Sequence, residues 1–282
     1  MEVLHTIADY RAARAKLEGT LGFVPTMGFF HQGHMELVRR AKAENVHAAV
    51  SIFVNPTQFG PNEDLAAYPR DLDRDLAMLR EEGTALVFNP TPEEMYPRGY
   101  VSYIEIGPVS QPMEGTYRPG HFRGVATVVA KLFNIAQADH AYFGQKDGQQ
   151  VAVIKRMARD LDFSVKVIVV PTVREPDGLA MSSRNVYLNA VGRKAALCLS
   201  RGLFEAQQQW AKGVRDAEKL RQAILDPIEK EPLARIDYVT LADADTMEEA
   251  SGQLARPTMA ALAVRIGKTR LIDDLVLGGV DL

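Results

Sequence analysis

The sequence predicts an α/β protein with a Rossmann-like doubly wound parallel sheet, followed by a smaller C-terminal α+β domain. Over the first two thirds of the chain, short apolar runs alternate with helical patterns. This alternation is typical of a mostly parallel sheet with helices on both faces. After about Tyr187 the pattern changes to two helices followed by three short strands. We therefore expect one domain at residues 1–185 and a second at residues 186–282.

Hydrophobic spacing defines the first strands and helices. A short strand is expected at residues 22–24, and residues 48–54 are almost wholly apolar, as in a strand buried on both faces. The segment 34–45 repeats apolar residues at helical spacing. The helix expected at residues 71–82 has leucines at i, i+4 and i+7 and stops before Gly83, a residue that suits a helix C-terminus.

The same reasoning predicts the other elements. The first domain is expected to add strands at residues 85–88, 101–106, 141–143 and 165–170 and helices at residues 124–136 and 149–160. The second domain is expected to contain helices at residues 189–212 and 216–229 and strands at residues 236–241, 259–266 and 270–275. Ligands of parallel sheets bind outside the carboxyl ends of the strands. The loops after Val24, Val54, Phe143 and Val170 should therefore share one rim, and they hold nearly every chemically suggestive residue.

Composition excludes several classes of protein. Hydrophobic residues make up 46% of the 282 residues and charged residues 24%, which is ordinary for a globular protein. The net charge of -3 gives no basic footprint for a nucleic acid. No apolar stretch approaches the ~20 residues of a membrane span, and the N-terminus lacks a signal-peptide pattern. With Cys198 as the single cysteine, a cytoplasmic protein without nucleic-acid or membrane partners is expected.

The first candidate site is a histidine pair between a strand and a helix. His31 and His34 share a helical face, and Gly28 and Gly33 allow a ligand to approach the backbone. A helix N-terminus favours phosphate, to which imidazoles can donate hydrogen bonds. Solvated or capping histidines are an alternative reading, and so is a metal site, although no nearby Cys or cluster of carboxylates completes one.

A second candidate site consists of amides after the next strand. Asn55 and Gln58 are side chains of the kind that orient a small polar ligand without charge. A polar turn is the alternative interpretation.

A third candidate site follows the short strand at residues 141–143. Lys146 is placed where an ammonium could reach a triphosphate, Asp147 could accept ribose hydroxyls or assist a magnesium ion, and Gln150 could face the substrate. An exposed Lys-Asp turn is the alternative.

A fourth candidate site follows the strand at residues 165–170. Ser182 and Ser183 offer hydroxyls and N–H groups at a turn, and Arg184 offers a fork of donors that matches phosphate. A capped helix start with a surface arginine would produce the same pattern.

Taken together, in order and with this spacing, the four segments resemble the pantothenate synthetase family. That family belongs to the His-x-Gly-His nucleotidyltransferase superfamily, which also contains the class I aminoacyl-tRNA synthetases. The resemblance extends over essentially the whole chain, and it implies an ATP site formed by Met27, Gly28, His31, Gly33, His34, Gly144, Lys146, Asp147, Val173, Met181, Ser182, Ser183 and Arg184. It also implies that Gln58, Gln150 and Asn55 bind substrate, and that His34, His31, Lys146 and Arg184 take part in catalysis.

The reaction implied by the resemblance has two steps. The carboxylate of pantoate attacks the α-phosphorus of ATP and releases pyrophosphate, and the amine of β-alanine then attacks the pantoyl adenylate to give pantothenate and AMP. Mg2+ is the expected cofactor, with ligands that the sequence does not identify, and a homodimer is the expected assembly. Arg123 could bind the carboxylate of pantoate or form a structural ion pair. The sequence does not separate the two roles, and a structural or supporting role is favoured. Gly148 stands where the family usually has Tyr.

Two other functions fit parts of the pattern. A nucleotidyltransferase that adenylates a phosphate acceptor would use the same histidine motif, but its acceptor site would favour Lys or Arg over Gln58 and Gln150. A non-catalytic nucleotide-binding module would be expected to lose the signature cations, which this chain retains at Lys146 and Arg184.

Overall fold

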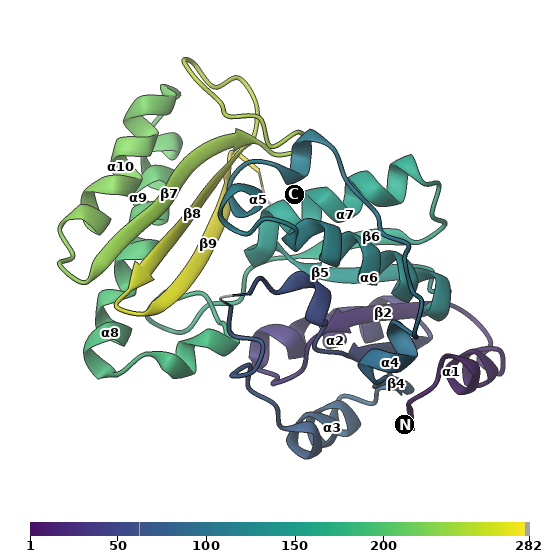
Figure 1. The fold of residues 1–282 in the computed structure, drawn as a ribbon. Coiled ribbons are helices and arrows are strands. Elements are labelled where there is room, and N and C mark those ends of the chain that lie inside the picture. Colours follow the sequence, from purple (N-terminus) through teal and green to yellow (C-terminus); the bar gives the residue numbers. More distant parts are fainter. Residues whose placement is uncertain (62, 280–282) are drawn as a thin grey trace. The chain divides into compact units, whose positions relative to one another are not determined.

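The computed structural model describes residues 1–61 and 63–279, which form two compact units (Figure 1). The first unit consists of Met1–Gly107, Arg118–Phe143 and Val153–Val170. The second consists of Pro108–Tyr117, Gly144–Ala152 and Pro171–Leu282, of which the last three residues lie outside the described part. The domain boundary after residue 185 stays a prediction.

The first unit is built on a six-stranded parallel sheet, which confirms the predicted fold class. Its strands in spatial order are β1 (Glu2–Leu4), β4 (Leu86–Phe88), β3 (His47–Ile52), β2 (Leu21–Thr26), β5 (His140–Gly144) and β6 (Lys166–Val170). The helices of this part of the chain are α1 (Ile7–Arg14), α2 (Gln32–Glu44), α3 (Leu72–Glu81), α4 (Pro92–Met95), α6 (His121–Ala136) and α7 (Gly148–Asp160), the last of which begins in residues of the second unit.

Alternate residues of the central strands face opposite layers of helices. One face packs Val24 and Val50 against α2 and α3 through Met35 and Leu79, in a cluster of buried side chains. The other face packs against α1 and α6, where the ring of Phe88 lies 5.2 Å from that of Tyr10. Both faces are therefore covered, as a doubly wound sheet requires.

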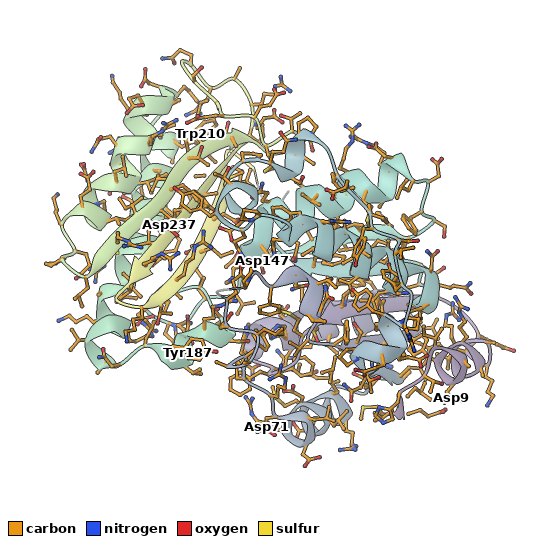
Figure 2. All side chains as sticks on the ribbon, viewed as in Figure 1. Asp9, Asp71, Asp147, Tyr187, Trp210 and Asp237 are labelled. Carbon is orange, nitrogen blue, oxygen red and sulfur yellow. The ribbon has the colours of Figure 1, made fainter. Side chains whose placement is uncertain are left out.

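Local sequence explains where α3 begins. Asp71, labelled in Figure 2, is the N-cap residue. Its carboxylate accepts a hydrogen bond from the backbone N–H of Arg74. Leu76 and Leu79 then bury one face of the helix. An aspartate at this position satisfies an N–H group that would otherwise lack a partner at the helix N-terminus.

Two sequence-based expectations were wrong, and two elements were not anticipated. Residues 101–106, all of which the structure describes, form no strand. The single helix expected at residues 189–212 is divided at Ala196 into α8 (Ala190–Ala195) and α9 (Leu197–Ala211). The N-terminal elements β1 and α1 were not anticipated. For β1, three residues are too few for a periodic signal.

The second unit has a three-stranded antiparallel sheet, which confirms the smaller α+β part. Its strands are β7 (Ala234–Asp243), β8 (Thr258–Ile266) and β9 (Thr269–Leu277), and its other helices are α5 (Glu114–Tyr117) and α10 (Ala217–Glu229). Helices α9 and α10 lie against this sheet (Figure 1). Buried residues of all these elements, such as Leu203, Ile224 and Leu262, form a core of their own.

Short 3-10 helices lie in several connections. They are η1 (Pro56–Gln58), η2 (Pro108–Ser110), η3 (Gln145–Asp147) and η4 (Ser183–Tyr187). Three of the four contain residues that the sequence analysis assigned to candidate sites. Within the described residues, no helix is both long and apolar enough to cross a membrane.

Candidate active site

The loop between β2 and α2 has an unusual backbone. Gly28 has a φ of +81° and Phe29 a φ of +53°, so two consecutive residues adopt the left-handed conformation. A Cβ atom on Gly28 would lie 3.0 Å from a carboxylate oxygen of Asp75 and 3.0 Å from Ile52. Glycine is therefore required at position 28 both for its conformation and for the close approach of α3.

The carboxylate of Asp75 holds this loop in place. Its two oxygens accept hydrogen bonds from the backbone N–H groups of Phe29, at 2.6 Å, and Phe30, at 2.8 Å. The side chain is buried, and burial raises the pKa of Asp75 above its usual value despite these hydrogen bonds. Sequence analysis missed this residue, although a carboxylate at an apolar position of α3, beside Leu76 and Leu79, was a signal for it.

His31 and His34 both cap the N-terminus of α2, because each ring accepts a hydrogen bond from a backbone N–H group there. The Nδ1 atom of His31 accepts from the N–H of Gly33 at 3.1 Å, and the Nδ1 atom of His34 accepts from the N–H of His31 at 3.4 Å. The ring centroids are 4.1 Å apart. Because both Nδ1 atoms accept from backbone donors, the proton of each neutral ring is on Nε2. The pair therefore has two Nε2–H donors at a helix N-terminus, so capping and phosphate binding are compatible.

Asn55 and Gln58 form one buried cluster with Met27. The Nδ2 atom of Asn55 donates to Oε1 of Gln58 at 3.1 Å, and Nε2 of Gln58 lies 3.1 Å from the sulfur of Met27. The Oδ1 atom of Asn55 accepts from the hydroxyl of Tyr96 at 2.8 Å. The structure thus shows Asn55 orienting Gln58, and direct contact of either amide with a substrate stays a prediction.

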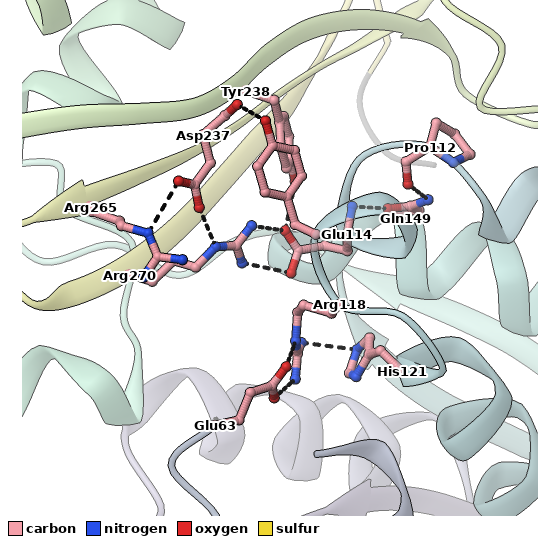
Figure 3. A network of polar contacts seen from close by, with 11 residues as sticks. Glu63, Pro112, Glu114, Arg118, His121, Gln149, Asp237, Tyr238, Arg265 and Arg270 are labelled. Carbon is pink, nitrogen blue, oxygen red and sulfur yellow. Dashed lines mark hydrogen bonds and ion pairs between the residues drawn. The ribbon is translucent and has the colours of Figure 1, made fainter. Parts of the chain in front are cut away.

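A charged residue that sequence analysis did not single out, Arg118, positions the backbone of Gln58 through His121; Figure 3 shows Arg118 with Glu63 and His121. Arg118 pairs with Glu63 at 2.6 Å and donates to Nε2 of His121 at 3.1 Å. An arginine can only donate, so Nδ1 of His121 carries the proton and donates to the carbonyl of Gln58 at 2.9 Å.

Helix α6 approaches η1 very closely at Gly124. A Cβ atom there would lie 2.3 Å from the carbonyl oxygen of Thr57 and 2.7 Å from the Cα atom of Gln58. The carbonyl of Gly124 accepts from Asn55 at 3.3 Å. Only glycine allows this contact, so the segment at residues 120–125 positions the amide pair. Arg123 lies elsewhere on α6, in an exposed ion pair with Glu105 at 3.1 Å, and its contact with pantoate stays untested.

A cavity of 290 Å³ adjoins the loop between β2 and α2 in the first unit. Its lining is mostly apolar and includes Met27, Phe29, Phe53 and Leu72, with Asp75 among the few charged residues. The left-handed residues Gly28 and Phe29 therefore line a space of small-molecule size, and His31 and His34 are not among its lining residues.

In the second unit, the turn that carries Lys146 is anchored to strand β9. The Oδ1 atom of Asp274 accepts from Nε2 of Gln145 at 3.0 Å, and its Oδ2 atom accepts from the N–H of Gly148 at 3.0 Å. Lys146 itself lies 3.5 Å from the carboxylate of Asp147. Gly148 is buried at the start of α7, where its N–H makes the contact with Asp274.

Burial, reinforced by the carboxylates of Asp273 and Asp147, raises the pKa of Asp274 to about 7. Because this folded-state pKa lies above the ordinary value of 3.8, the group favours the folded state most at low pH, and that contribution is lost as the pH rises to 7.

Asp274→Asn removes this titration. The free energy of unfolding of the wild type should therefore fall relative to that of Asp274→Asn as the pH rises from 5 to 7, by up to about 1.4 kcal/mol per pH unit, and stay level above pH 8. Denaturant unfolding of both proteins at several pH values measures the difference, and a gap independent of pH would contradict it.

A second turn of the same unit is also anchored to β9. Arg174 makes a bidentate ion pair with Asp273, at 2.6 and 2.9 Å, and donates to the carbonyl of Gly178. The N–H of Met181 donates to the carbonyl of Val173 at 3.0 Å, which closes the turn. The segment that carries Ser182 through Arg184 follows directly.

That segment is a short capped helix. The hydroxyl of Ser182 accepts from the backbone N–H of Arg184 at 3.2 Å, and Ser183 is buried. The capped start considered from the sequence is therefore present, with Arg184 in the first turn of η4.

Ion pairs attach the segment at residues 108–117 to the C-terminal sheet of the second unit (Figure 3). Both carboxylate oxygens of Glu114 accept from Arg270 of β9, at 2.8 and 2.6 Å, and Arg270 also pairs with Asp237 at 2.7 Å. The N–H of Glu114 donates to Gln149, the neighbour of Gln150 in α7. This network ties the first turn of α7 to the C-terminal sheet.

The two units thus each gather part of the expected site. The first unit brings together the residues of the β2–α2 loop and of η1, namely Met27, Gly28, His31, Gly33, His34, Asn55 and Gln58. The second unit attaches two segments to adjacent residues of β9, one with Gly144, Lys146, Asp147 and Gln150 and one with Val173, Met181, Ser182, Ser183 and Arg184.

The fold and the histidine pair define an α/β protein of the His-x-Gly-His type, with the motif at the N-terminus of the first helix after a parallel strand. The sequence profile of the family "Pantoate-beta-alanine ligase" matches residues 2–276. The chain belongs to this family, whose members are ligases.

Individual relatives agree with this assignment over their full length. The chain is 58% identical to pantothenate synthetase from Roseiflexus sp. (strain RS-1), over 98% of this chain and 99% of that protein. The crystal structure of pantothenate synthetase from Thermus thermophilus has a TM-score of 0.93 at 47% identity, over 98% and 99% of the two chains. Pantoate-beta-alanine ligase from Francisella tularensis, complexed with beta-gamma ATP and beta-alanine, has a TM-score of 0.81 at 35% identity, over 99% of each chain.

Proposed function

We propose that this protein condenses pantoate with β-alanine at the expense of ATP, through a pantoyl adenylate, and releases AMP and pyrophosphate. The observation that carries the proposal is the histidine pair, which has two Nε2–H donors at the N-terminus of α2 in a chain of this family. A carboxylate resists attack by an amine because its leaving group would be oxide. Adenylation replaces that leaving group with AMP.

In the first step, negative charge builds up on the phosphate oxygens as pyrophosphate leaves. Catalysis of such a step depends on positioning and electrostatic stabilisation. We assign the stabilisation to His31 and His34, by hydrogen bonds from Nε2, and to Lys146 and Arg184, by charge. The proposal requires all four side chains to contact one triphosphate during the reaction.

Mg2+ fits this site as an ion held mainly by the nucleotide. Among the described residues, no group of three or more His, Cys, Asp or Glu side chains could hold a metal ion. Mg2+ commonly keeps several waters and is bound through phosphates and one or two carboxylates. Asp147, next to Lys146 and 45% exposed, would supply such a carboxylate, and the ion would neutralise charge on the phosphates.

We assign the binding of pantoate to the amide side chains of Gln58 and Gln150. Gln58 has an amide fixed by Asn55, and Gln150 lies partly exposed in the first turn of α7. In the second step the amine of β-alanine attacks the adenylate carbonyl, and AMP leaves. Water would hydrolyse the adenylate, so we assign the exclusion of water to the C-terminal domain at residues 186–282, acting as a lid.

The proposed function is tested by release of pyrophosphate. With ATP, Mg2+ and pantoate, one equivalent of pyrophosphate per active site is expected, and continuous turnover with equal amounts of AMP and pantothenate is expected once β-alanine is added. Sustained pyrophosphate release with a phosphate acceptor would favour a nucleotidyltransferase instead. ATP binding without any pyrophosphate would favour a non-catalytic module.

We further propose a homodimer that acts in the cytoplasm. Cys198 is buried as a free thiol, which suits a reducing compartment. The segment at residues 101–103, which forms neither helix nor strand, exposes apolar side chains, with Val101 81% and Tyr103 43% exposed, and a second copy of the chain would cover them.

Val101→Glu is therefore expected to shift the protein from dimer to monomer, because a charge would be buried in the interface. Sedimentation velocity measures the change. Val46→Glu, at another exposed valine, serves as the matched control and should leave the dimer intact. A Val101→Glu protein that is still dimeric would rule out this surface.

A further inference from the structure

Strand β9 carries two adjacent buried carboxylates, Asp273 and Asp274, which are 2% and 5% exposed. Neither belongs to the residues assigned above to ATP or to the substrates. Burial of a carboxylate costs free energy unless donors surround it. The contacts of the two residues therefore indicate what each of them does.

Asp273 is compensated by a cation. Its bidentate partner Arg174 also lies over the ring of Phe204, at 5.0 Å, so this ion pair resembles an ordinary buried structural pair. Asp274 differs, because the two groups that donate hydrogen bonds to its carboxylate are both neutral. They are the side-chain amide of Gln145 and the backbone N–H of Gly148. An apolar side chain at position 274 would avoid the cost of burying a charge.

The carboxylate of Asp274 fixes the conformation of one turn, η3. Gln145 immediately precedes Lys146, and Gly148 is the first residue of α7, so the carboxylate holds η3 at both ends. The N–H of Gly148 belongs to the helix N-terminus, where a negative charge is favoured. The backbone position of Lys146 is thereby determined by a residue 128 positions further along the chain (274 − 146).

We propose that Asp274 is the positioning residue of Lys146. By accepting one hydrogen bond on each side of that residue, it fixes the turn from which the ammonium extends. The inference rests on the proposed function, in which Lys146 stabilises the phosphates of ATP. Asp274 itself contacts neither the nucleotide nor the reacting atoms, and it acts only through Lys146.

Two substitutions and their combination test this. Asp274→Leu should lower kcat for pyrophosphate release by about 10- to 100-fold, as expected for a misplaced catalytic group, while KM for pantoate changes little. Lys146→Ala should also lower kcat. If Asp274 acts through Lys146, the double variant should be no slower than Lys146→Ala alone, whereas independent effects would multiply.

The conservative variant separates positioning from charge. In Asp274→Asn, the side-chain oxygen can still accept from Gly148, and the new amide can donate to Gln145 once the Gln145 amide rotates. Most of the wild-type kcat should therefore return. Asp243→Leu is the control, because the carboxylate of Asp243 likewise holds a turn by accepting N–H groups, here the backbone N–H groups of Asp245 and Thr246.

The outcomes are distinct. Wild-type kcat in Asp274→Leu, multiplicative losses in the double variant, or an equal loss in Asp243→Leu would each overturn the positioning role. If Asp274→Leu is not recovered as a folded protein, Gln145→Leu takes its place, because it removes one of the two contacts. Its kcat is then compared, alone and combined with Lys146→Ala, in the same way. Wild-type kcat in Lys146→Ala would instead contradict the proposed function of that lysine.

Discussion

His34→Ala is expected to lower kcat for adenylation by about 100-fold or more, the usual effect of removing a donor that stabilises developing charge. The Nδ1 atom of His34 accepts from the N–H of His31, so the proton of the neutral ring lies on Nε2, the atom assigned to the leaving phosphates. Rapid-quench measurement of pyrophosphate formation, with ATP and pantoate saturating, isolates this step.

The same substitution also removes part of the α2 cap, which costs about 1 kcal/mol of stability. A control in the same helical turn separates the two effects. Gln32→Ala changes an exposed side chain that bonds to Arg39, and it should leave kcat unchanged. Near-normal adenylation by a folded His34→Ala protein would refute the role of this histidine.

Gly124→Ala is expected to have the second largest effect. Its new methyl group would lie 2.3 Å from the carbonyl oxygen of Thr57, a distance that forces η1 to move. Overpacking of this kind costs about 1–3 kcal/mol. Displacement of Gln58 by about 1 Å would lower kcat/KM for pantoate by about 100-fold. Steady-state kinetics with varied pantoate, together with the thermal unfolding midpoint, measures both consequences.

Gly107→Ala is the matched control for this substitution. A Cβ atom at Gly107 would meet nothing within 4 Å, and its backbone is not in the left-handed region. The control should therefore behave as wild type. Equal KM for pantoate in Gly124→Ala and wild type would show that the position of η1 does not govern substrate binding.

The sheet and the candidate loops could be predicted because their signals are local. A continuous apolar run such as residues 48–54 indicates a buried strand, and the β2–α2 loop carries its histidines and glycines within eight residues. The break at Ala196 could not be predicted, since neither proline nor glycine marks it. Residues 101–106 have the apolar spacing of a strand, but no pairing partner confirms one in the described structure.

The residues that position the site could not be assigned from the sequence, because their partners are remote. Asp75 bonds to the backbone of Phe29 across 46 residues, and Asp274 bonds to Gly148 across 126. The contact of Asp75 depends on how α3 packs within the first unit, and the contact of Asp274 depends on how β9 packs within the second. A short window of sequence does not contain that information. The one local signal for Asp75 was its place on the apolar face of α3, where a carboxylate is unexpected.

Transfer of oxygen from the acid to AMP tests the adenylate most directly. Pantoate labelled with 18O in its carboxylate is incubated with the enzyme, ATP, Mg2+ and β-alanine, and the AMP is analysed by mass spectrometry. Attack of the carboxylate on the α-phosphorus predicts one 18O atom in the phosphate of each AMP formed. AMP without label, or label in inorganic phosphate, would contradict a pantoyl adenylate and the assignment of the histidine pair to its formation.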